Sequence, residues 1–378
     1  MAAKIRVGIV GATITPGGSG WGANAHVKAL NALPGYELKA VCTAHPETAR
    51  ASAADFGAEL AFHNFDEMVA RPDVDLVAVV VRVPGHYGLV VRALEAGKAV
   101  FCEWPLGASR AEAKAMAQLA HARQLPTAVG LQARSDPALM YARELVRQDY
   151  IGEVISVRCG AVSQAITQRG MGRIWQSNRA NGANTLTIAA GHAIDALCFV
   201  VGEIAEVSAR LATRIREWHN TDTGETVPVD SPDWISLSGR LAGGAEVSCL
   251  VSTVPWSPSG NRVEIYGRDG TLVISGGSLN TGPNRLHGAR GTETLTALEP
   301  PERFTLVPDR VPAGAPRNVA QAYARLATAL AAGEPFEPDF AHAVKRHTLI
   351  EAIERSSAEG RSVRVQEVKE LPHSDLER

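Results

Sequence analysis

A short apolar run that turns through glycines into a helix is the feature that most constrains this chain. Residues 5–10 read IRVGIV, a glycine-rich loop follows over residues 11–22, and a helical pattern covers residues 24–33. Pro34 and Gly35 end that pattern because neither residue sustains a helix interior. A strand joined in this way to a helix is a βα unit. Its apolar strand is buried only when several such units build one parallel sheet.

The βα units repeat as far as residue 131. Residues 76–81 are wholly apolar and rich in valine, as expected of a strand covered on both faces. Ser109 followed by Glu112 is a capping box that opens another helix. The pattern predicts an α/β protein whose N-terminal domain, residues 1–135, is a doubly wound Rossmann domain. The other predicted strands cover residues 38–42, 99–102 and 127–131, and the predicted helices cover residues 47–56, 86–96 and 109–124.

The pattern changes after Gly152. Alternating segments predict a C-terminal α+β domain, residues 136–378, with a mostly antiparallel open sheet and one helix near residues 186–201. Residues 276–317 are rich in Gly and Pro and are expected to be loops. The predicted strands cover residues 154–162, 207–213, 234–241, 246–254, 263–266 and 272–274. Two late helices, residues 318–332 and 339–358, are expected to pack on the sheet or back on the first domain.

Composition and net charge limit the classes of partner that we expect. The net charge is −2 and the chain has no basic run, so we expect neither a nucleic-acid partner nor an anionic membrane surface. The five cysteines are scattered without CxxC or Cys/His spacing, which predicts reduced thiols in a cytoplasmic protein and no metal site. No apolar run reaches the roughly 18 residues of a membrane span. The expected partners are a small-molecule substrate and, through the open sheet face, further copies in a homodimer or homotetramer.

The glycine-rich loop is a candidate cofactor site. Gly8, Gly11 and Ala12 follow the first strand, where a dinucleotide-binding fold needs small residues so that the backbone can approach a pyrophosphate. The third glycine of a strict GxGxxG motif is absent, and the loop is longer and contains Trp21. The alternative is a glycine-rich turn that binds nothing. The position between strand and helix favours the cofactor site.

The end of the second strand bears on the choice of dinucleotide. An Asp or Glu there would accept hydrogen bonds from the adenosine ribose and repel a 2′-phosphate. This strand instead ends near Thr43 and His45, and no carboxylate follows it directly. The pattern therefore favours NADP over NAD as cofactor. If Thr43 is only a turn residue, NAD binds equally well.

Two further loops are expected to face the cofactor, because ligands bind at the carboxyl ends of parallel strands. Arg82, Pro84 and His86 follow the strand at residues 76–81, and His86 either contacts the site or caps its helix. Glu103 and Trp104 end the next strand, and the following Pro105 fixes an extended backbone.

Several motifs together resemble one family. The chain is similar to the glucose–fructose oxidoreductase, inositol dehydrogenase and rhizopine-catabolism family (Gfo/Idh/MocA), and its nearest branch is that of the fungal galactose-pathway repressor. The motifs that resemble the family are Gly8-x-x-Gly11, residues 93–98, Glu103-x-Pro105, residues 150–154, residues 191–195 and residues 349–353. Those shared with the repressor branch are Gly20-Trp21, Glu103-Trp104 and residues 131–134.

The resemblance implies site residues and exposes two departures. Family enzymes usually carry a Lys where this chain has Trp104 and often an Asp where it has Ile188. Of that Lys/Asp/His trio only His192 remains, so it is the candidate acid–base group. Asp195 either orients its imidazole or caps a neighbouring element. Further candidates for contact with substrate are Gln132, Arg134 and Trp175.

Three functions follow from the resemblance. The first is an NAD(P)-dependent oxidoreductase that transfers hydride between nicotinamide and a sugar, polyol or similar hydroxylated small molecule. The second is a non-catalytic dinucleotide-binding sensor or regulator, which the missing Lys and Asp favour. The third is an enzyme with tightly bound NAD that acts as a lyase or hydrolase through transient oxidation.

Overall fold

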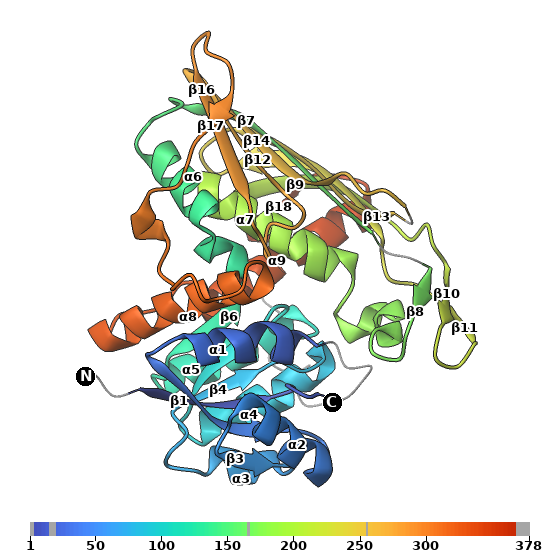
Figure 1. Ribbon diagram of the computed structural model, residues 1–378. Coiled ribbons are helices and arrows are strands. Elements are labelled where there is room, and N and C mark those ends of the chain that lie inside the picture. The colour runs from blue at the N-terminus through green and yellow to red at the C-terminus, as the bar shows by residue number, and fades with distance from the viewer. Residues whose placement is uncertain (1–3, 15–19, 165–166, 255, 368–378) are drawn as a thin grey trace. The chain divides into compact units, whose positions relative to one another are not determined.

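The chain folds into two compact units (Figure 1). The computed structural model describes residues 4–14, 20–164, 167–254 and 256–367, so part of the glycine-rich loop lies outside the described residues. The first unit comprises residues 1–132, 171–173 and 306–344, and the second comprises residues 133–170, 174–305 and 345–378.

The first unit contains a six-stranded parallel sheet in the order β3-β2-β1-β4-β5-β6. This order confirms the doubly wound prediction, since the strand sequence reverses direction between β1 and β4. The short strand β3 was not predicted, because an apolar run of three residues is too short to mark a strand. The strands are β1 (Ile5–Val10), β2 (Tyr36–Cys42), β3 (Leu60–Phe62), β4 (Leu76–Val79), β5 (Ala99–Glu103) and β6 (Thr127–Gly130).

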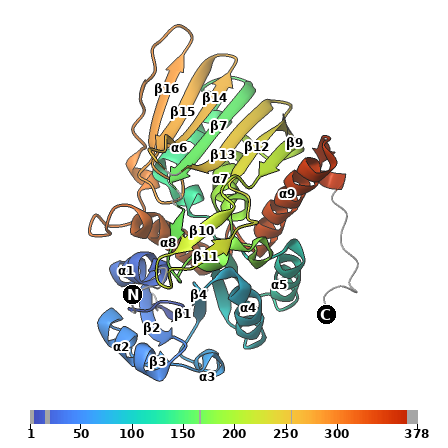
Figure 2. The same ribbon diagram turned by 90° about the vertical axis from the view of Figure 1, so that its right-hand side faces the viewer.

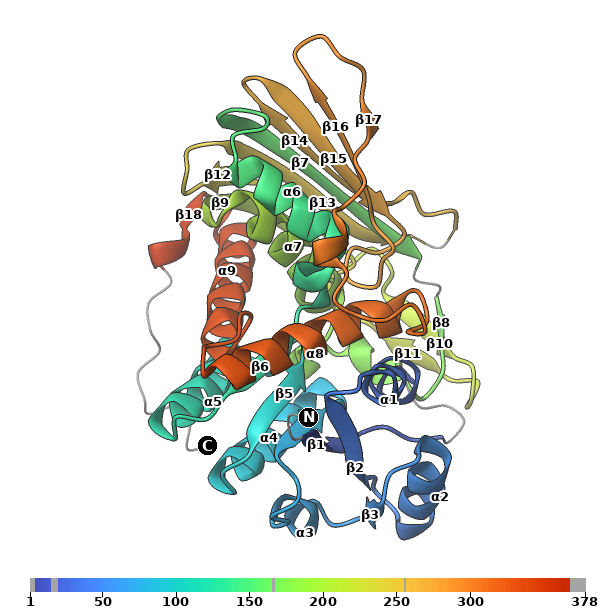
Figure 3. The ribbon, with the colours of Figure 1, turned by 60° about the vertical axis from the view of Figure 1, so that its left-hand side comes forward.

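One of the two late helices, α8 (Ala315–Ala332), belongs to the first unit (Figure 3). Its residues Val319, Tyr323 and Leu326 share one apolar core cluster with Val27 and Leu30, so α8 packs against the helix that follows β1. The other helices of this unit are η1 (Gly22–Val27), α1 (Lys28–Ala32), α2 (Pro46–Phe56), α3 (Phe65–Val69), α4 (His86–Glu95) and α5 (Arg110–Ala122).

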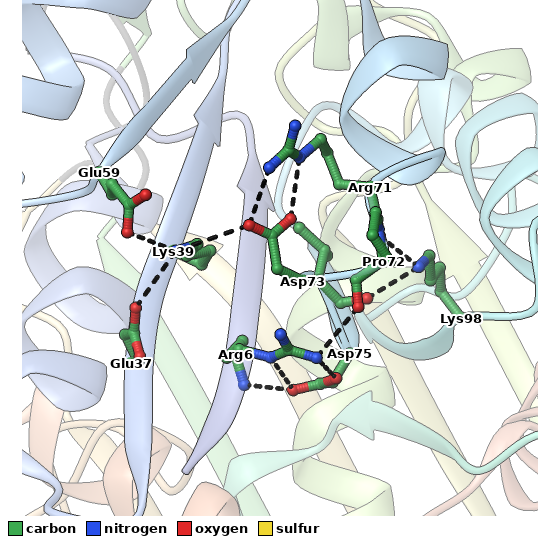
Figure 4. Close-up of polar contacts among 10 residues, drawn as sticks. Arg6, Glu37, Lys39, Glu59, Arg71, Pro72, Asp73, Asp75 and Lys98 are labelled. Carbon is green, nitrogen blue, oxygen red and sulfur yellow. Dashed lines mark hydrogen bonds and ion pairs between the residues drawn. The ribbon is translucent and has the colours of Figure 1, made fainter.

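Ion pairs join the amino ends of the parallel strands (Figure 4). Arg6 at the start of β1 donates to the Asp75 carboxylate at 2.7 and 2.9 Å. Lys98, just before β5, donates from Nζ to the carbonyls of Arg71 and Val74 at 2.7 and 2.9 Å. The remaining members are Glu37, Lys39, Glu59 and Asp73. These charged side chains hold the amino ends of the strands together. A ligand is expected at the opposite edge of the sheet, where the strands have their carboxyl ends.

The second unit contains a nine-stranded sheet in the order β17-β16-β15-β14-β7-β13-β12-β9-β18 (Figure 2). Only β13 and β7 pair in parallel, so the mostly antiparallel prediction is confirmed. The loop prediction for residues 276–317 was wrong where β16 pairs with β15, because β16 carries glycine and arginine in place of an apolar alternation. The strands are β7 (Val154–Gln164), β9 (Ile204–Ala212), β12 (Trp234–Leu241), β13 (Glu246–Val254), β14 (Gly260–Gly267), β15 (Gly270–Gly276), β16 (Arg285–Arg290), β17 (Thr296–Ala297) and β18 (Val363–Arg364).

Helices cover one face of this sheet (Figures 1 and 3). They are α6 (Pro137–Arg147), η6 (Thr185–Ala190), α7 (Gly191–Val201) and α9 (Phe340–Glu359), of which α9 begins in the first unit. Figure 2 shows the other face, over which no helix of the described residues lies. A small separate sheet is formed by β8 (Gln168–Arg169), β10 (Glu217–Asn220) and β11 (Thr226–Pro228).

Candidate functional site

The turn after β1 is shaped for close backbone approach. Gly11 has a φ of 98°, and a Cβ at this position would lie 2.5 Å from the carbonyl oxygen of Val80. A Cβ on Gly22 would lie 2.9 Å from Cα of Ala12, so only glycine lets the first helix start against the end of β1. The two glycines therefore allow the tight turn and the close packing of helix on strand that a pyrophosphate-binding turn requires.

Gly8 and Trp21 are also predicted to contact the cofactor, and the structure places them in different surroundings from Gly11 and Gly22. Gly8 is buried inside β1, where a Cβ would meet Met68 Sδ at 3.1 Å, so its smallness serves packing of the sheet against α3. The Trp21 indole Nε1 is buried and has no hydrogen-bond acceptor among the described residues. A buried donor without an acceptor fits a site that an anionic ligand completes.

A pocket of about 420 Å³ opens at the carboxyl ends of β1 and β2. Thr43 Oγ1 lies 2.6 Å from Thr48 Oγ1 and donates to the His45 carbonyl at 3.0 Å. Neither His63 nor Phe65 was predicted here, because His63 follows the unrecognised strand β3 and Phe65 begins the short helix α3. No carboxylate is among the described lining residues, which are Val10, Gly11, Thr13, Cys42, Thr43, Ala44, His45, Thr48, His63, Phe65 and Val81.

The loop after β4 holds His86 in a structural position. Its Nδ1 lies 2.9 Å from the Pro105 carbonyl and its Nε2 lies 3.0 Å from the Val81 carbonyl. Burial lowers the pKa of His86 below its ordinary value. Both ring nitrogens face backbone carbonyls, and α4 has no side-chain cap, so the helix-capping alternative is wrong. Contact of His86 with the cofactor stays a prediction. His86 braces the β4 loop against the β5 loop.

Arg82, Pro84 and Trp104 lie beside that brace at the same edge. Arg82 Nη2 donates to the carbonyl of Met171 at 3.0 Å, which ties the short segment 171–173 to the first unit. Pro84 is exposed in a short 3₁₀ turn. Trp104 is only 5% exposed and precedes a cis peptide bond. Its indole fills space at the end of β5 where family enzymes carry an ammonium group.

Glu103 is the acidic end of a buried polar network. His26 Nε2 lies 2.9 Å from Glu103 Oε1, and His26 Nδ1 lies 2.9 Å from the Tyr323 hydroxyl. Gln132 Nε2 donates to both carboxylate oxygens at 2.8 and 3.0 Å. Sequence reasoning found Glu103 and Gln132 but missed His26 and Tyr323, which are 297 positions apart in the chain. The structure thus places Gln132 with the cofactor-side residues of the first unit.

His192 lies in the second unit on α7, is 8% exposed, and follows the π-helical turn η6 that contains Ile188. Asp195 lies one turn further along α7, where its carboxylate accepts from Arg134 at 2.8 and 3.0 Å and from Arg346 at 3.2 Å. Asp195 therefore pairs with two buried guanidinium groups. Its role as the orienting partner of the His192 imidazole stays a prediction.

The ion cluster changes the interpretation of Arg134. Its side chain is 3% exposed and both donors to Asp195 are inside the fold, so Arg134 is a core residue of the second unit. Its contact with substrate stays a prediction. Arg346 extends the cluster to Glu203 at 3.0 Å. Trp175, the third predicted substrate contact, lies half-buried in a short 3₁₀ turn and its carbonyl accepts from Asn181 at 2.6 Å.

Three observations bear on metal binding, membrane insertion and the state of the cysteines. Within the ranges that the structure describes, no group of His, Cys, Asp and Glu is arranged to hold a metal ion. One helix, residues 179–201, is long and apolar enough to cross a membrane, but 72% of its most apolar window is buried, as in the core helix of a globular domain. All five cysteines are buried free thiols.

Comparison with known proteins gives two family models. The model described as "Oxidoreductase family, NAD-binding Rossmann fold" (Gfo/Idh/MocA) matches residues 5–131, and "Gal80p, C-terminal domain" matches residues 137–276. Dehydrogenase aclE of Aspergillus oryzae is 33% identical over 291 residues, which are 74% of this chain and 79% of that protein. The regulatory protein GAL80 of Saccharomyces cerevisiae is 26% identical over 298 residues (73% and 67%). D-apiose dehydrogenase of Paraburkholderia graminis is 26% identical over 354 residues (93% and 89%).

Proposed function

Because the chain belongs to the Gfo/Idh/MocA oxidoreductase family and has a C-terminal domain of the Gal80p type, we propose that it is an NAD(P)-dependent dehydrogenase or reductase of a sugar, polyol or similar hydroxylated small molecule. The observation that carries the proposal is the tight glycine turn of Gly11 and Gly22 beside the pocket at the end of β2. The D-apiose dehydrogenase relative supports the substrate class. We place this enzyme in the cytoplasm, where buried free thiols persist.

The cofactor and the chain's own residues have separate tasks in this reaction. A bound cofactor supplies the hydride chemistry, and the protein positions it and handles the proton. Oxidation of an alcohol releases a proton, and a neutral imidazole takes it at a working pH near neutrality. We assign that step to His192, since Trp104 exchanges no proton where the family has Lys.

The direct test is turnover. Purified protein is mixed with NADP+ or NAD+ and a panel of polyols and aldoses, and absorbance is followed at the band of the reduced nicotinamide. A substrate-dependent rise supports the dehydrogenase. If dinucleotide binds tightly and no substrate reacts, the regulator takes its place, which the GAL80 relative and the residues Trp104 and Ile188 favour. Product formed without a net absorbance change supports transient oxidation by a bound NAD.

The pocket at the end of β2 supports a preference for NADP(H). Thr43 and His45 stand where NAD-specific proteins carry a carboxylate, so nothing in the described lining repels a 2′-phosphate. We expect calorimetric titration to show tighter binding of NADP(H) than of NAD(H). Thr43→Asp should weaken NADP(H) about tenfold or more through like-charge repulsion and leave NAD(H) binding intact. A wild-type preference for NAD(H) would reject the NADP assignment and keep the dinucleotide site.

The uncovered face of the nine-stranded sheet supports a homodimer or homotetramer. Ser208, Ser238 and Ser248 are paired in one exposed row across β9, β12 and β13, and the row continues to the exposed Arg158 on β7. Ser238→Arg should shift the species seen by analytical ultracentrifugation towards the monomer. Thr223→Arg, on the exposed β10–β11 hairpin, is the matched control. A monomeric wild type, or an unchanged distribution for Ser238→Arg, rejects this interface.

A further inference from the structure

The hydrogen-bond pattern around His26 fixes its protons. Burial raises the pKa of the Tyr323 hydroxyl well above its ordinary value, so Tyr323 keeps its proton and donates it to His26 Nδ1. Nε2 then carries the imidazole proton and donates to Glu103. A doubly protonated His26 would leave the Tyr323 hydroxyl without an acceptor among the described residues. The neutral imidazole gives both of its ring nitrogens and the Tyr323 hydroxyl a partner, and the network keeps the single negative charge of Glu103.

Gln132 is oriented by the same carboxylate. Its amide nitrogen faces both Glu103 oxygens, and the opposite orientation would put two acceptors against each other. The amide oxygen is therefore turned away, and it is buried without a donor among the residues described. Gly130 makes the arrangement possible, because a Cβ at this position would collide with the Glu103 carboxylate and lie 2.9 Å from Gln132 Nε2. A buried acceptor without a donor marks a place where a ligand is expected to donate.

The network lies at the edge of the sheet where the nicotinamide half of a dinucleotide is expected. Glu103 closes β5, and Gln132 follows β6, so both lie at the carboxyl ends of the second βαβ half of the sheet. The adenosine half is accommodated by the β1–β2 pocket, which leaves the nicotinamide half for β4 to β6. The Glu103 side chain is 12% exposed, whereas His26, Tyr323 and Gln132 are at most 1% exposed. The network therefore presents its charge outward only through Glu103.

We propose that Tyr323, His26 and Gln132 are positioning residues that hold Glu103 as a fixed anion beside the nicotinamide half of the cofactor, where Glu103 and the Gln132 carbonyl accept hydrogen bonds from ribose hydroxyl or carboxamide donors. This inference rests on the proposed dinucleotide site. The oxidised nicotinamide ring carries a positive charge and the reduced ring carries none. A fixed carboxylate at this position favours binding of the oxidised form.

Glu103→Gln removes the charge and keeps the shape, and it tests the inference without turnover. Dissociation constants for the oxidised and reduced dinucleotide are measured by calorimetry and by fluorescence of the reduced form. We expect Glu103→Gln to weaken the oxidised form about tenfold more than the reduced form. Tyr323→Phe should move the same ratio in the same direction, since His26 Nδ1 then loses its donor and is free to take a proton that cancels the Glu103 charge.

The controls separate this inference from the function on which it rests. Glu95→Gln removes an exposed carboxylate on α4 and should leave the ratio at its wild-type value. Gln132→Met keeps the volume, removes both the donor and the acceptor of the side-chain amide, and should weaken both forms together. If wild-type protein binds dinucleotide but neither Glu103→Gln nor Tyr323→Phe changes the ratio, the anion role is wrong and the cofactor site stands. If the wild type binds neither form, the proposed function fails, and the inference fails with it.

Discussion

Replacing His192 with alanine is expected to lower turnover about 10²- to 10⁴-fold on any substrate that the wild-type protein oxidises. That range is the usual contribution of one positioned acid–base group. No second family-matching group is available to share the task, since Trp104 and Ile188 replace the usual Lys and Asp. His192 belongs to the second unit, so the affinity of the first unit for dinucleotide should stay nearly unchanged.

Steady-state kinetics with a parallel binding titration checks this expectation. His219→Ala, which removes an exposed histidine of the same unit, is the matched control and should keep full turnover. Trp104→Lys restores the common family residue but is not expected to raise activity, because Ile188 still supplies no carboxylate. Full turnover by His192→Ala would show that the proton leaves through a tyrosine or through water, and the assignment to His192 would then be wrong.

Local patterns predicted most of the fold. The strands β12 and β13 begin and end at the predicted residues, because strict alternation and a glycine turn at residues 242–244 mark their bounds. Ser109 caps α5 as its spacing from Glu112 predicts, with Oγ accepting from the Glu112 amide at 3.2 Å. β16 was missed since its stability comes from pairing with β15 and not from its own composition.

Pairings between distant residues could not be predicted in the same way. The contact of His26 with Tyr323 depends on α8 packing beside α1, and no local pattern encodes that packing. For the same reason, the sequence predicted only that Asp195 lies near His192 on one helix. It did not predict the two arginine partners of Asp195, which are 61 and 151 positions away in the chain. The sequence predicts the edge of the sheet at which a ligand is expected, but it does not distinguish residues that would contact the ligand from residues that only position them.

Replacing Asp195 with alanine should destabilise the second unit by about 3–5 kcal/mol, because the change leaves the guanidinium groups of Arg134 and Arg346 buried without their shared counter-charge. Denaturant unfolding followed by circular dichroism measures this loss. Glu153→Ala breaks the exposed pair with Arg268 and is the control, with an expected change within about 1 kcal/mol. A loss of under about 1 kcal/mol for Asp195→Ala would mean that the cluster is not the support that its burial implies.

Asp195→Asn separates the two roles of this residue. The amide keeps the shape and one acceptor oxygen but loses the charge, so the unit is destabilised while enough folded protein remains for kinetics. If Asp195 only neutralises the arginines, turnover per folded molecule stays at the wild-type level. If it also orients the His192 imidazole, turnover per folded molecule falls and the pH dependence of kcat shifts, because a carboxylate beside an imidazole favours the charged form. These two outcomes distinguish a structural role of Asp195 from a catalytic one. The alanine variant does not make this distinction.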